Sequence, residues 1–389
     1  MADPEPVVAL FGHRLAGAEP TGVGRHVAEL VHALATVADP GLQYRTASLR
    51  EPRPGWLPRG VEHLAVPGPR RPLALAWTLT GHPTLERLAA PVDLVHTLLT
   101  WLPVPTRRPL VATVHDLMFL RHPEWYGWTE RSLYQRALRQ VAGEARAVLT
   151  GSQFVADDIA ANLGVESSRL HVVHHGVPLA FTTPPDPSVV AAVCSENGLQ
   201  PGAYLLAVGA VSHRKNASVV TRALARLAPT GRVELVLAGP EGPGADKVRN
   251  EVDRLGMSDR VRLTGYLPDE ELVALMAGAC ALVHGAKDEG FGYPPLEAMA
   301  LGVPVLAASA GSLPEIVGDG GVVLDPDDPD AWAGSIASLR DDHDHRDALV
   351  TAGRARAAEF SASAEAEAVI RLHRGVLGLD GDGQASARS

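Results

Sequence analysis

Residues 287–304 read KDEGFGYPPLEAMALGVP, and this stretch holds two glutamates, Glu289 and Glu297. Glu289 lies in a glycine-containing loop that a hydroxyl-rich ligand can approach closely. Glu297 lies just inside a helix that we expect to begin near Pro294 or Pro295, because proline is pre-organised for a first helical turn. The start of that helix offers backbone N–H groups and a positive dipole end to a phosphate. The stretch therefore predicts a site for a ligand that carries both phosphate and sugar hydroxyls.

Short aliphatic runs alternate with helical patterns twice along the chain, which is typical of parallel sheets covered by helices. The first series predicts strands near 7–11, 42–48, 93–96, 110–114, 146–150 and 170–173, and helices near 23–36, 129–143 and 152–163. After a Pro-rich break at 178–187, the second series predicts strands near 204–208, 232–238, 261–263, 280–284, 304–307 and 321–324. Its helices are expected near 216–227, 245–255, 269–278, 295–301, 329–340, 346–359 and 362–377. We expect two doubly wound α/β domains that bind ligands at the carboxyl ends of their strands.

The length of 389 residues also favours two domains, since it exceeds the usual size of a single hydrophobic core. We predict an N-terminal Rossmann-like domain over 1–180 and a C-terminal Rossmann-like domain over 181–361. A last helix over 362–378 is expected to precede a disordered polar tail over 379–389. We expect a cytoplasmic protein, because the sequence shows neither a membrane-spanning run nor the basic start and long apolar region of a signal peptide.

Charge is unevenly distributed between the two halves. Residues 1–180 carry 17 basic and 16 acidic side chains, and the remainder carries 18 and 29. Neither half is basic enough to indicate binding of nucleic acid. The two cysteines, Cys194 and Cys280, cannot build a disulfide framework or a cysteine-based zinc site.

A glycine loop follows the first predicted strand. Gly22, Val23, Gly24 and Arg25 form a segment that permits close approach of a ligand. An ordinary strand-to-helix turn explains the same pattern. The loop lies too far from the strand, and holds too few glycines, to be a dinucleotide fingerprint, which argues against a nicotinamide enzyme.

Two polar residues, His115 and Asp116, end the strand predicted at 110–114. One interpretation is a loop histidine followed by a capping aspartate. The functional interpretation places His115 beside a reacting sugar, where it can hydrogen-bond a hydroxyl or help to carry developing positive charge.

Two adjacent cations, Arg214 and Lys215, stand at the entrance of the helix predicted at 216–227. Cations at a helix N-terminus oppose the helix dipole unless an anion lies between them. A diphosphate resolves that conflict, with arginine as a fork and lysine as a point charge. The alternative is a solvated surface pair.

The loop at Tyr266 and Leu267 precedes a helix with three acidic residues in its first turn. Those acids are most simply partners of the helix dipole. The backbone at Tyr266 and Leu267 can nevertheless meet a flat base ring.

Three patterns of metal-ligand residue types favour a structural interpretation. Residues 325–330 contain an Asp-x-Asp, but they lie between a strand and a helix, where turn and N-cap chemistry explains them. Residues 341–345 read DDHDH and look like a solvated helix start. His174 and His175 close a strand at the domain border and are expected to form a hinge or a cleft wall.

Several of these pieces, taken together and in order along nearly the whole chain, resemble the retaining glycosyltransferases of family 4, which have the GT-B fold. The matching pieces are residues 22–26, 113–117, 151–154, 172–177, 209–216, 289–297, 311–315 and 324–326. The pieces that carry Glu289 and Glu297 are the most specific. Two departures concern local contacts: Ala210 stands where many relatives have arginine, and His175 where many have asparagine.

The resemblance implies a role for each motif. The C-terminal domain would bind a nucleoside-diphosphate sugar and the N-terminal domain an acceptor. Arg214 and Lys215 would hold the diphosphate, Glu289 the sugar hydroxyls and Glu297 the ribose hydroxyls. The backbone at Gly290, Phe291 and Gly292 would line the donor pocket, and His115 would lie near the anomeric carbon. Gly22, Val23, Gly24, Arg25 and Asp116 would belong to the acceptor side. The final helix would cross back to the first domain.

The resemblance also implies transfer with retention of the anomeric configuration, with no metal and no cofactor. GDP-mannose is the favoured donor, and UDP- or dTDP-sugars stay open. The acceptor is either a small metabolite or a lipid-linked glycan, so peripheral contact with the inner face of a membrane stays open as well. The alternatives are an epimerase or a phosphorylase on the same fold, or a sugar-binding protein without chemistry.

Overall fold

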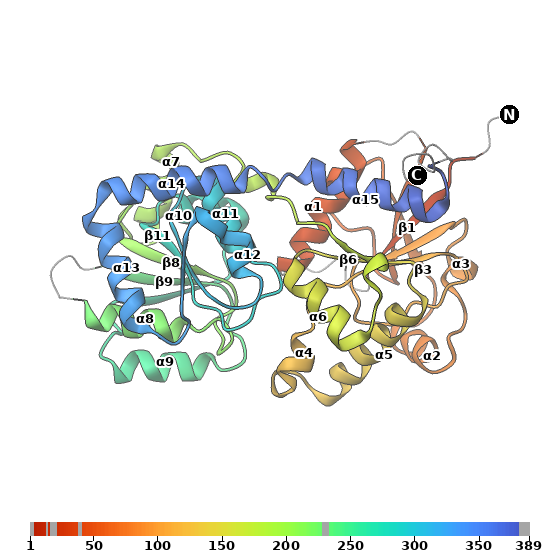
Figure 1. The fold of residues 1–389 in the computed structure, drawn as a ribbon, viewed down its shortest axis with the longest axis horizontal. Coiled ribbons are helices and arrows are strands. Elements are labelled where there is room, and N and C mark those ends of the chain that lie inside the picture. The colour runs from red at the N-terminus through yellow and green to blue at the C-terminus, as the bar shows by residue number, and fades with distance from the viewer. Residues whose placement is uncertain (1–3, 13–14, 16–21, 38–40, 228–232, 381–389) are drawn as a thin grey trace, which may run out of the picture. The chain divides into compact units, whose positions relative to one another are not determined.

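The chain forms two compact units, shown in Figure 1, in a computed structural model that describes residues 4–12, 15, 22–37, 41–227 and 233–380. Unit 1 comprises residues 1–176 together with 362–389, and unit 2 comprises residues 177–361. Most of the tail predicted at 379–389 lies outside the described residues. No helix within the described ranges is long and apolar enough to cross a bilayer.

Unit 1 is built on a seven-stranded parallel sheet in the order β3-β2-β1-β4-β5-β6-β7. Its strands are β1 (Val7–Phe11), β2 (Gln43–Leu49), β3 (Glu62–Val66), β4 (Leu94–Thr97), β5 (Leu110–Thr113), β6 (Ala147–Thr150) and β7 (Leu170–Val172). Its helices are α1 (Gly22–Val37), α2 (Arg70–Thr80), α3 (Leu85–Leu88), α4 (Met118–Arg121), α5 (Trp128–Glu144), α6 (Gln153–Leu163) and α15 (Ala362–Leu377), with 3-10 turns η1 (Pro123–Trp125) and η2 (Ser167–Arg169). The central strands β1, β4, β5 and β6 are buried along their whole length, as expected for a parallel sheet covered on both faces.

Unit 2 repeats the plan with six parallel strands in the order β10-β9-β8-β11-β12-β13. Its strands are β8 (Tyr204–Val208), β9 (Glu234–Ala238), β10 (Val261–Gly265), β11 (Ala281–His284), β12 (Val305–Ala308) and β13 (Val322–Leu324). Its helices are α7 (Pro187–Glu196), α8 (Ala217–Arg226), α9 (Ala245–Arg254), α10 (Asp269–Ala277), α11 (Tyr293–Leu301), α12 (Leu313–Val317), α13 (Pro329–Asp341) and α14 (His343–Ala357), with 3-10 turns η3 (Leu179–Phe181) and η4 (Gly318–Gly320). The order reverses direction between β8 and β11, so the loops after these strands border the crevice where doubly wound sheets bind ligands.

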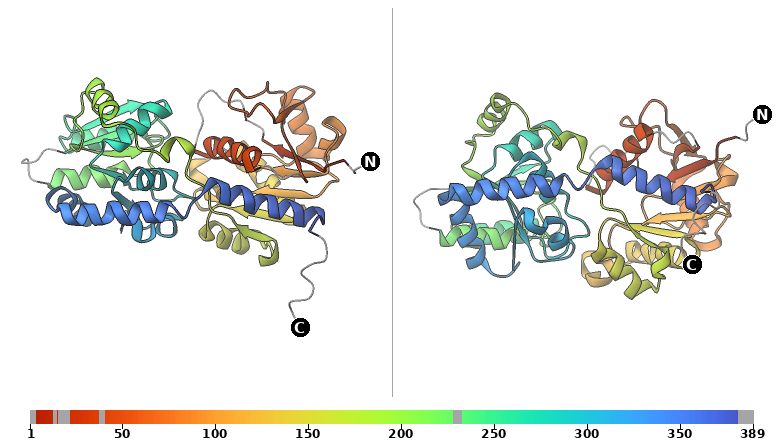
Figure 2. Two further views of the ribbon diagram at one scale, coloured as in Figure 1. Left: turned by 90° about the horizontal axis from the view of Figure 1, so that it is seen from above. Right: turned by 45° about the horizontal axis from the view of Figure 1, so that its top comes forward.

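Helices cover both faces of each sheet, as the two views of Figure 2 show. In unit 1, α1 and α15 pack on one face, and α2, α3, α5 and α6 on the other. In unit 2, residues of α8, α9 and α13 share one core cluster, and residues of α7, α10 and α11 share the other. The last helix therefore belongs to unit 1, where Ala366, Val369 and Ile370 pack against α1, as predicted.

The structure adds elements that the sequence patterns did not indicate. These are β3, α2, α3, α4, α7 and α12. The break predicted at 178–187 was wrong at its C-terminal end, because Pro187 starts α7. Asp186 caps this helix by accepting a hydrogen bond from the Ser188 N–H at 2.8 Å. Proline is well suited to a first helical turn, so its presence there did not mark a loop.

Candidate active site

The loop after β8 carries Arg214 and Lys215 to the start of α8. Gly209 begins this loop with φ of 119°, a conformation that favours glycine, and a Cβ there would lie 3.0 Å from Lys215 Cε. Asn216 precedes α8 and donates from Nδ2 to the carbonyl oxygens of Gly285 and Pro326, at 3.0 Å each. The loops after three strands are thus tied together at one residue, which holds the two neighbouring cations in place.

The loop after β11 carries Glu289 and is supported from behind by the loop after β12. Ser312 donates from Oγ to the carbonyl oxygens of Glu289 and Phe291, at 3.0 and 2.7 Å. Gly311 has φ of 59°, and a Cβ there would come within 2.3 Å of the Glu289 carbonyl oxygen. The close approach of these two backbones therefore requires glycine at position 311.

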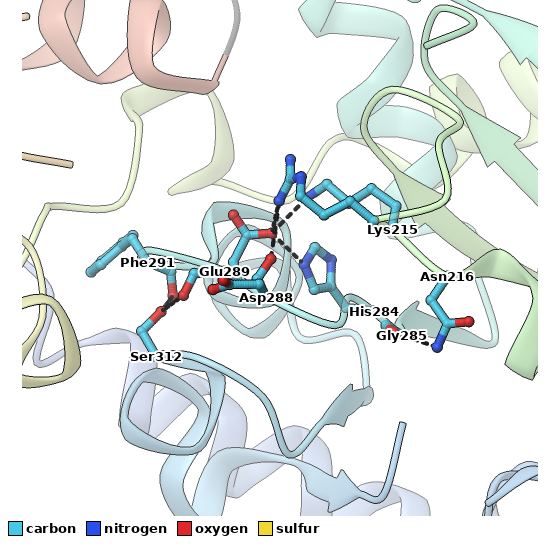
Figure 3. Close-up of polar contacts among 9 residues, drawn as sticks. Lys215, Asn216, His284, Gly285, Asp288, Glu289, Phe291 and Ser312 are labelled. Carbon is cyan, nitrogen blue, oxygen red and sulfur yellow. Dashed lines mark hydrogen bonds and ion pairs between the residues drawn. The ribbon is translucent and has the colours of Figure 1, made fainter. Parts of the chain in front are cut away.

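Three basic side chains surround one carboxylate oxygen, as Figure 3 shows for Lys215 and His284. Oε2 of Glu289 accepts from Lys215 Nζ at 2.7 Å, from His284 Nε2 at 3.1 Å and from Arg214 Nη1 at 3.3 Å. Arg214 also donates to the carbonyl oxygen of Asp288 at 3.1 Å. The cluster joins the loops after β8 and β11 at the point where the strand order reverses.

The charge state of the cluster follows from its pKa shifts. Burial raises the pKa of Glu289, but Lys215 and Arg214 outweigh burial and hold that pKa well below its usual range. Burial lowers the pKa of His284 to about 4, helped by the charge of Lys215, so His284 is neutral at pH 7. Burial also lowers the pKa of Lys215, against the opposite effect of Glu289. With both cations charged, the cluster keeps one excess positive charge beside a helix N-terminus.

Sequence reasoning singled out Arg214, Lys215 and Glu289, and the structure brings these three together. It did not single out His284, whose side chain is 2% exposed. His284 ends β11 five residues before Glu289. The sequence signal that could have identified His284 is its position at the carboxyl end of a predicted strand.

The remaining residues that were predicted for the donor side lie in unit 2. Glu297 is fully buried in α11, and its charge raises the pKa of Lys215. Leu267 is buried, and Tyr266, which follows β10, is 40% exposed. Gly292 immediately precedes α11 with φ of 111°, so the chain turns there into the helix. The structure shows no bond between Tyr266 or Leu267 and the charge cluster among the contacts of the described residues.

In unit 1, the glycine segment Gly22, Val23, Gly24 and Arg25 forms the first turn of α1. The prediction of a loop over these residues was therefore wrong, and the helix predicted at 23–36 is confirmed. The segment nevertheless lies at a helix N-terminus, where the helix dipole favours an anion.

His115 and Asp116 directly follow β5. Asp116 accepts a hydrogen bond from the Met118 N–H at 3.0 Å, which fits a turn-forming aspartate. His115 donates from Nε2 to the carbonyl oxygen of Leu98 at 2.9 Å. Burial lowers the pKa of His115 well below its usual value, so the imidazole is neutral at pH 7.

His115 lies beside two further histidines that sequence reasoning did not assign to the site. The ring centroid of His26 in α1 is 5.4 Å from that of His115 and 3.7 Å from that of His175. Both His26 and His175 contact the carboxylate of Glu365 in α15. The expectation that His175 forms a hinge or cleft wall missed this contact, because its partner is 190 residues away.

Metal-ligand residue types gather at one place among the described residues. His26, His115 and His175 each offer a ring nitrogen, and these atoms lie within 4.8 Å of one another. The Asp-x-Asp of residues 325–330 instead serves as turn and cap, since Asp328 Oδ1 accepts from the N–H groups of Asp330 and Ala331 at 3.0 and 3.1 Å. Asp342 similarly caps α14 by accepting from the His345 N–H at 2.9 Å.

Two family models match the chain one after the other. Residues 20–181 match Glycosyltransferase Family 4, and residues 196–356 match Glycosyl transferases group 1. The O-antigen chain mannosyltransferase B of Escherichia coli is 32% identical over 64% of this chain and 66% of its own length. The D-inositol 3-phosphate glycosyltransferase of Corynebacterium efficiens is 30% identical over 73% and 69%. The MMP alpha-(1->4)-mannosyltransferase of Mycolicibacterium hassiacum is 34% identical over 64% and 61%. The chain thus spans about two thirds of the length of these curated relatives.

Solved structures share the fold at low sequence identity. Anabaena HepE in complex with UDP and glucose has a TM-score of 0.74 at 20% identity, covering 95% of this chain and all of that chain. WaaG, a glycosyltransferase involved in lipopolysaccharide biosynthesis, has a TM-score of 0.73 at 19% identity, covering 94% and 99%. The chain belongs to glycosyltransferase family 4 and has the GT-B fold, as its two sheets, its motifs and these relatives show.

Proposed function

We propose that this protein transfers a sugar from a nucleoside-diphosphate sugar to an acceptor hydroxyl, with retention of the anomeric configuration and without a metal. The observation that carries the proposal is the cluster of Arg214, Lys215 and Glu289 at the strand-order reversal of unit 2. Unit 2 binds the donor, and unit 1 binds the acceptor and contributes His115.

The charge of the cluster suits a diphosphate. One carboxylate does not neutralise two cations, so an anionic ligand gains from entering beside them. Arg214 supplies a planar fork and Lys215 a point charge, which together match the oxygens of a diphosphate. The backbone of Gly290, Phe291 and Gly292 lines the donor pocket at the start of α11, where the helix dipole favours a negative charge.

The two glutamates bind the two sugars of the donor in this proposal. Glu289 takes hydroxyls of the transferred sugar, and Glu297 takes those of the ribose. Carboxylates accept hydrogen bonds only, so each matches a pair of hydroxyl donors. Tyr266 and Leu267 border the base.

The reaction breaks the bond between the anomeric carbon and a phosphate oxygen and forms a bond from that carbon to the acceptor oxygen. Because the configuration is retained, the acceptor approaches on the face that the diphosphate leaves. The departing phosphate oxygen takes the proton of the acceptor hydroxyl. Stabilising the diphosphate charge is then the main task of the protein, and preorganised donors of this kind contribute about 10²–10³ each in rate. His115, neutral and fixed through Leu98, accepts a hydrogen bond from a sugar hydroxyl.

GDP-mannose is the proposed donor, and UDP- and dTDP-sugars are the alternatives. The choice is supported by the resemblance of residues 113–117 and 214–216 to mannosyltransferases, and by the two mannosyltransferases among the relatives. For the acceptor, a small metabolite and a lipid-linked glycan remain the two classes. The names of the relatives include both an O-antigen chain and an inositol phosphate.

The proposal is tested by incubating the protein with labelled GDP-mannose, UDP-glucose and dTDP-glucose in EDTA, with and without an acceptor panel of free inositol phosphates and short mannosides. We expect free nucleoside diphosphate and a new α-linked product, identified by its one-bond C1–H1 coupling in NMR. Conversion of the donor sugar without an acceptor indicates an epimerase. Dependence on inorganic phosphate indicates a phosphorylase. Binding without turnover of any donor indicates a sugar-binding protein, and each of these three results contradicts the proposal.

A further inference from the structure

The last helix, α15, inserts a single carboxylate under the histidines beside His115. Glu365 is 5% exposed, and His26 and His175 are 2% and 4% exposed. Oε1 of Glu365 accepts from His26 Nε2 at 2.6 Å and from His175 Nδ1 at 3.1 Å, and Oε2 accepts from the Gly176 N–H at 2.8 Å. Burying an ionised carboxylate is costly unless donors compensate it, and here three donors do so.

These partners determine which ring nitrogens carry hydrogen. An ionised carboxylate can only accept, so His26 must donate from Nε2 and His175 from Nδ1. The backbone carbonyl of Leu98 is likewise an acceptor only, so His115 donates from Nε2. For a neutral His115, Nδ1 is then the nitrogen with the lone pair.

The rings of His26 and His175 contact the ring of His115, so their fixed orientations limit its orientation. The three rings contact one another: the centroid of His26 is 3.7 Å from that of His175 and 5.4 Å from that of His115, and the centroids of His115 and His175 are 5.8 Å apart. Behind His175 stands Gly151, where a Cβ would come within 2.5 Å of His175 Nε2. The three rings therefore have no room to shift toward Gly151, and Glu365 fixes the orientations of the His26 and His175 rings.

We propose that Glu365 is a positioning residue for His115: it fixes the tautomers and orientations of His26 and His175, and these hold the His115 ring with Nδ1 as its acceptor atom. The proposal rests on the proposed function, in which His115 contacts the sugar. In this proposal α15 contributes to the reaction through Glu365, in addition to its packing in unit 1.

The charges around His115 are consistent with this role. His26 from α1 and His175 after β7 lower its pKa, in addition to burial, while Glu365 from α15 opposes them. His96 from β4 is neutral as well, because burial lowers its pKa well below 6.5, with further effects from His373, His26 and His115. For Glu365, burial raises the pKa, but the contacts with His26 and His175 outweigh burial, so the carboxylate stays ionised at pH 7.

The same helix offers a matched control. His373 is also fully buried, and its ring nitrogens lie 3.0 Å from His96 Nδ1 and 3.1 Å from the Tyr44 hydroxyl. Its loss should loosen α15 while the hydrogen bonds of Glu365 to His26, His175 and Gly176 stay in place. The pair of variants Glu365→Gln and His373→Asn therefore separates positioning of His115 from docking of the helix.

The experiment measures kcat/KM for the acceptor, the donor KM and the melting temperature of both variants. We expect Glu365→Gln to lower the acceptor kcat/KM about 10- to 100-fold, since misplacing a catalytic group by about 1 Å has effects of this size. The donor KM should stay within about twofold. His373→Asn should keep kcat/KM within about threefold at a similar loss of melting temperature. Equal losses of kcat/KM in the two variants would overturn the proposal.

A second measurement does not depend on turnover. In ¹⁵N-histidine NMR spectra of the wild-type protein, His175 should be the Nδ1–H tautomer, with its signal assigned through His175→Asn. An Nε2–H tautomer overturns the positioning role, even if Glu365→Gln does not fold. A wild-type protein that shows the expected tautomer but turns over no donor contradicts the proposed function and leaves the tautomer assignment intact.

Discussion

At the scale of single residues, Lys215 is the side chain on which the proposed donor site depends most. Its Nζ lies 2.7 Å from Glu289 in a cluster that keeps one excess positive charge. Removing this cation leaves Arg214 to face both the carboxylate and the diphosphate. The cluster therefore loses its net positive charge, and the departing diphosphate loses a preorganised partner.

We expect Lys215→Ala to lower kcat at least about tenfold, since loss of one such donor costs about 10²–10³ in rate. Lys287→Ala is the matched control, because its Nζ pairs with Asp327 at the surface, where ion pairs contribute about 0–1 kcal/mol. Initial rates at saturating donor measure both variants. A rate for Lys215→Ala equal to that of Lys287→Ala would contradict the assignment.

The residues of the charge cluster were only partly accessible to sequence reasoning. Arg214 and Lys215 stood out because cations at a helix start need an anion, and Glu289 because of its glycine-containing loop. His284 was overlooked although it ends the predicted strand five residues before Glu289, whereas Ser312 did not stand out because it contacts a loop that follows a different strand. The spacing of two residues along the chain does not indicate whether they meet when they follow different strands.

At the scale of elements, the turn before α12 supports the loop that carries Glu289. Gly311 has φ of 59°, and its Cα faces the Glu289 carbonyl oxygen so closely that a Cβ would lie 2.3 Å away. A side chain at position 311 would collide with the backbone of Glu289. Backbone atoms cannot turn aside as the end of a flexible side chain can, so one of the two segments would have to move. The expected consequence is a shifted loop and a weaker donor site.

We expect Gly311→Ala to destabilise the protein by about 1–3 kcal/mol, the usual cost of a strained backbone position, and to raise the Kd for the nucleoside diphosphate. Gly334→Ala is the control, because Gly334 lies within α13 with open space around its Cα. It should stabilise the helix by about 0.5–1 kcal/mol. Urea unfolding and calorimetric titration measure both effects, and a Gly311→Ala protein with unchanged stability and affinity would rule out this support.

The patterns of the second unit predicted its elements better than those of the first. All six strands of unit 2 have counterparts among the predicted ranges, because most of them are short apolar runs between turn residues. In unit 1, β3 reads EHLAV and is only partly buried, so it lacks the apolar run of a central strand. α4 and α12 have four and five residues, too few for a helical period to show.

At the scale of the whole molecule, buried neutral histidines make the fold sensitive to acid. Burial lowers the pKa of His373 to about 3, and burial is also the main reason why the pKa values of His175 and His284 are about 4. These values lie below the 6.5 of an exposed histidine, so the unfolded chain takes up protons first as the pH falls. Stability that is fully present above pH 6.5 is therefore lost between pH 6.5 and about 4.

We expect the urea midpoint to stay level from pH 7.5 to about pH 6.5 and to fall from there to pH 5, with a loss of up to about 1.4 kcal/mol per pH unit for each of these histidines. The pKa of Glu289 is also low, so protonation of its carboxylate lowers the stability of the fold further at still lower pH. Unfolding curves followed by circular dichroism at several pH values test this expectation. A midpoint that is constant or rises toward pH 5 would show that these histidines are not buried as neutral groups.

The central claim is that unit 2 binds the diphosphate of a nucleotide sugar through Arg214 and Lys215 without a divalent ion. The most direct measurement is a thermal-shift panel of GDP, UDP, dTDP and ADP in EDTA, on wild-type protein and on Lys215→Ala. Bound ligand stabilises a fold by about 2.7 kcal/mol at a hundredfold excess over Kd, so one nucleotide, GDP in our proposal, should raise the melting temperature of the wild-type protein clearly more than that of the variant. No shift with any nucleotide, or a shift that appears only when Mg²⁺ replaces EDTA, would contradict the claim.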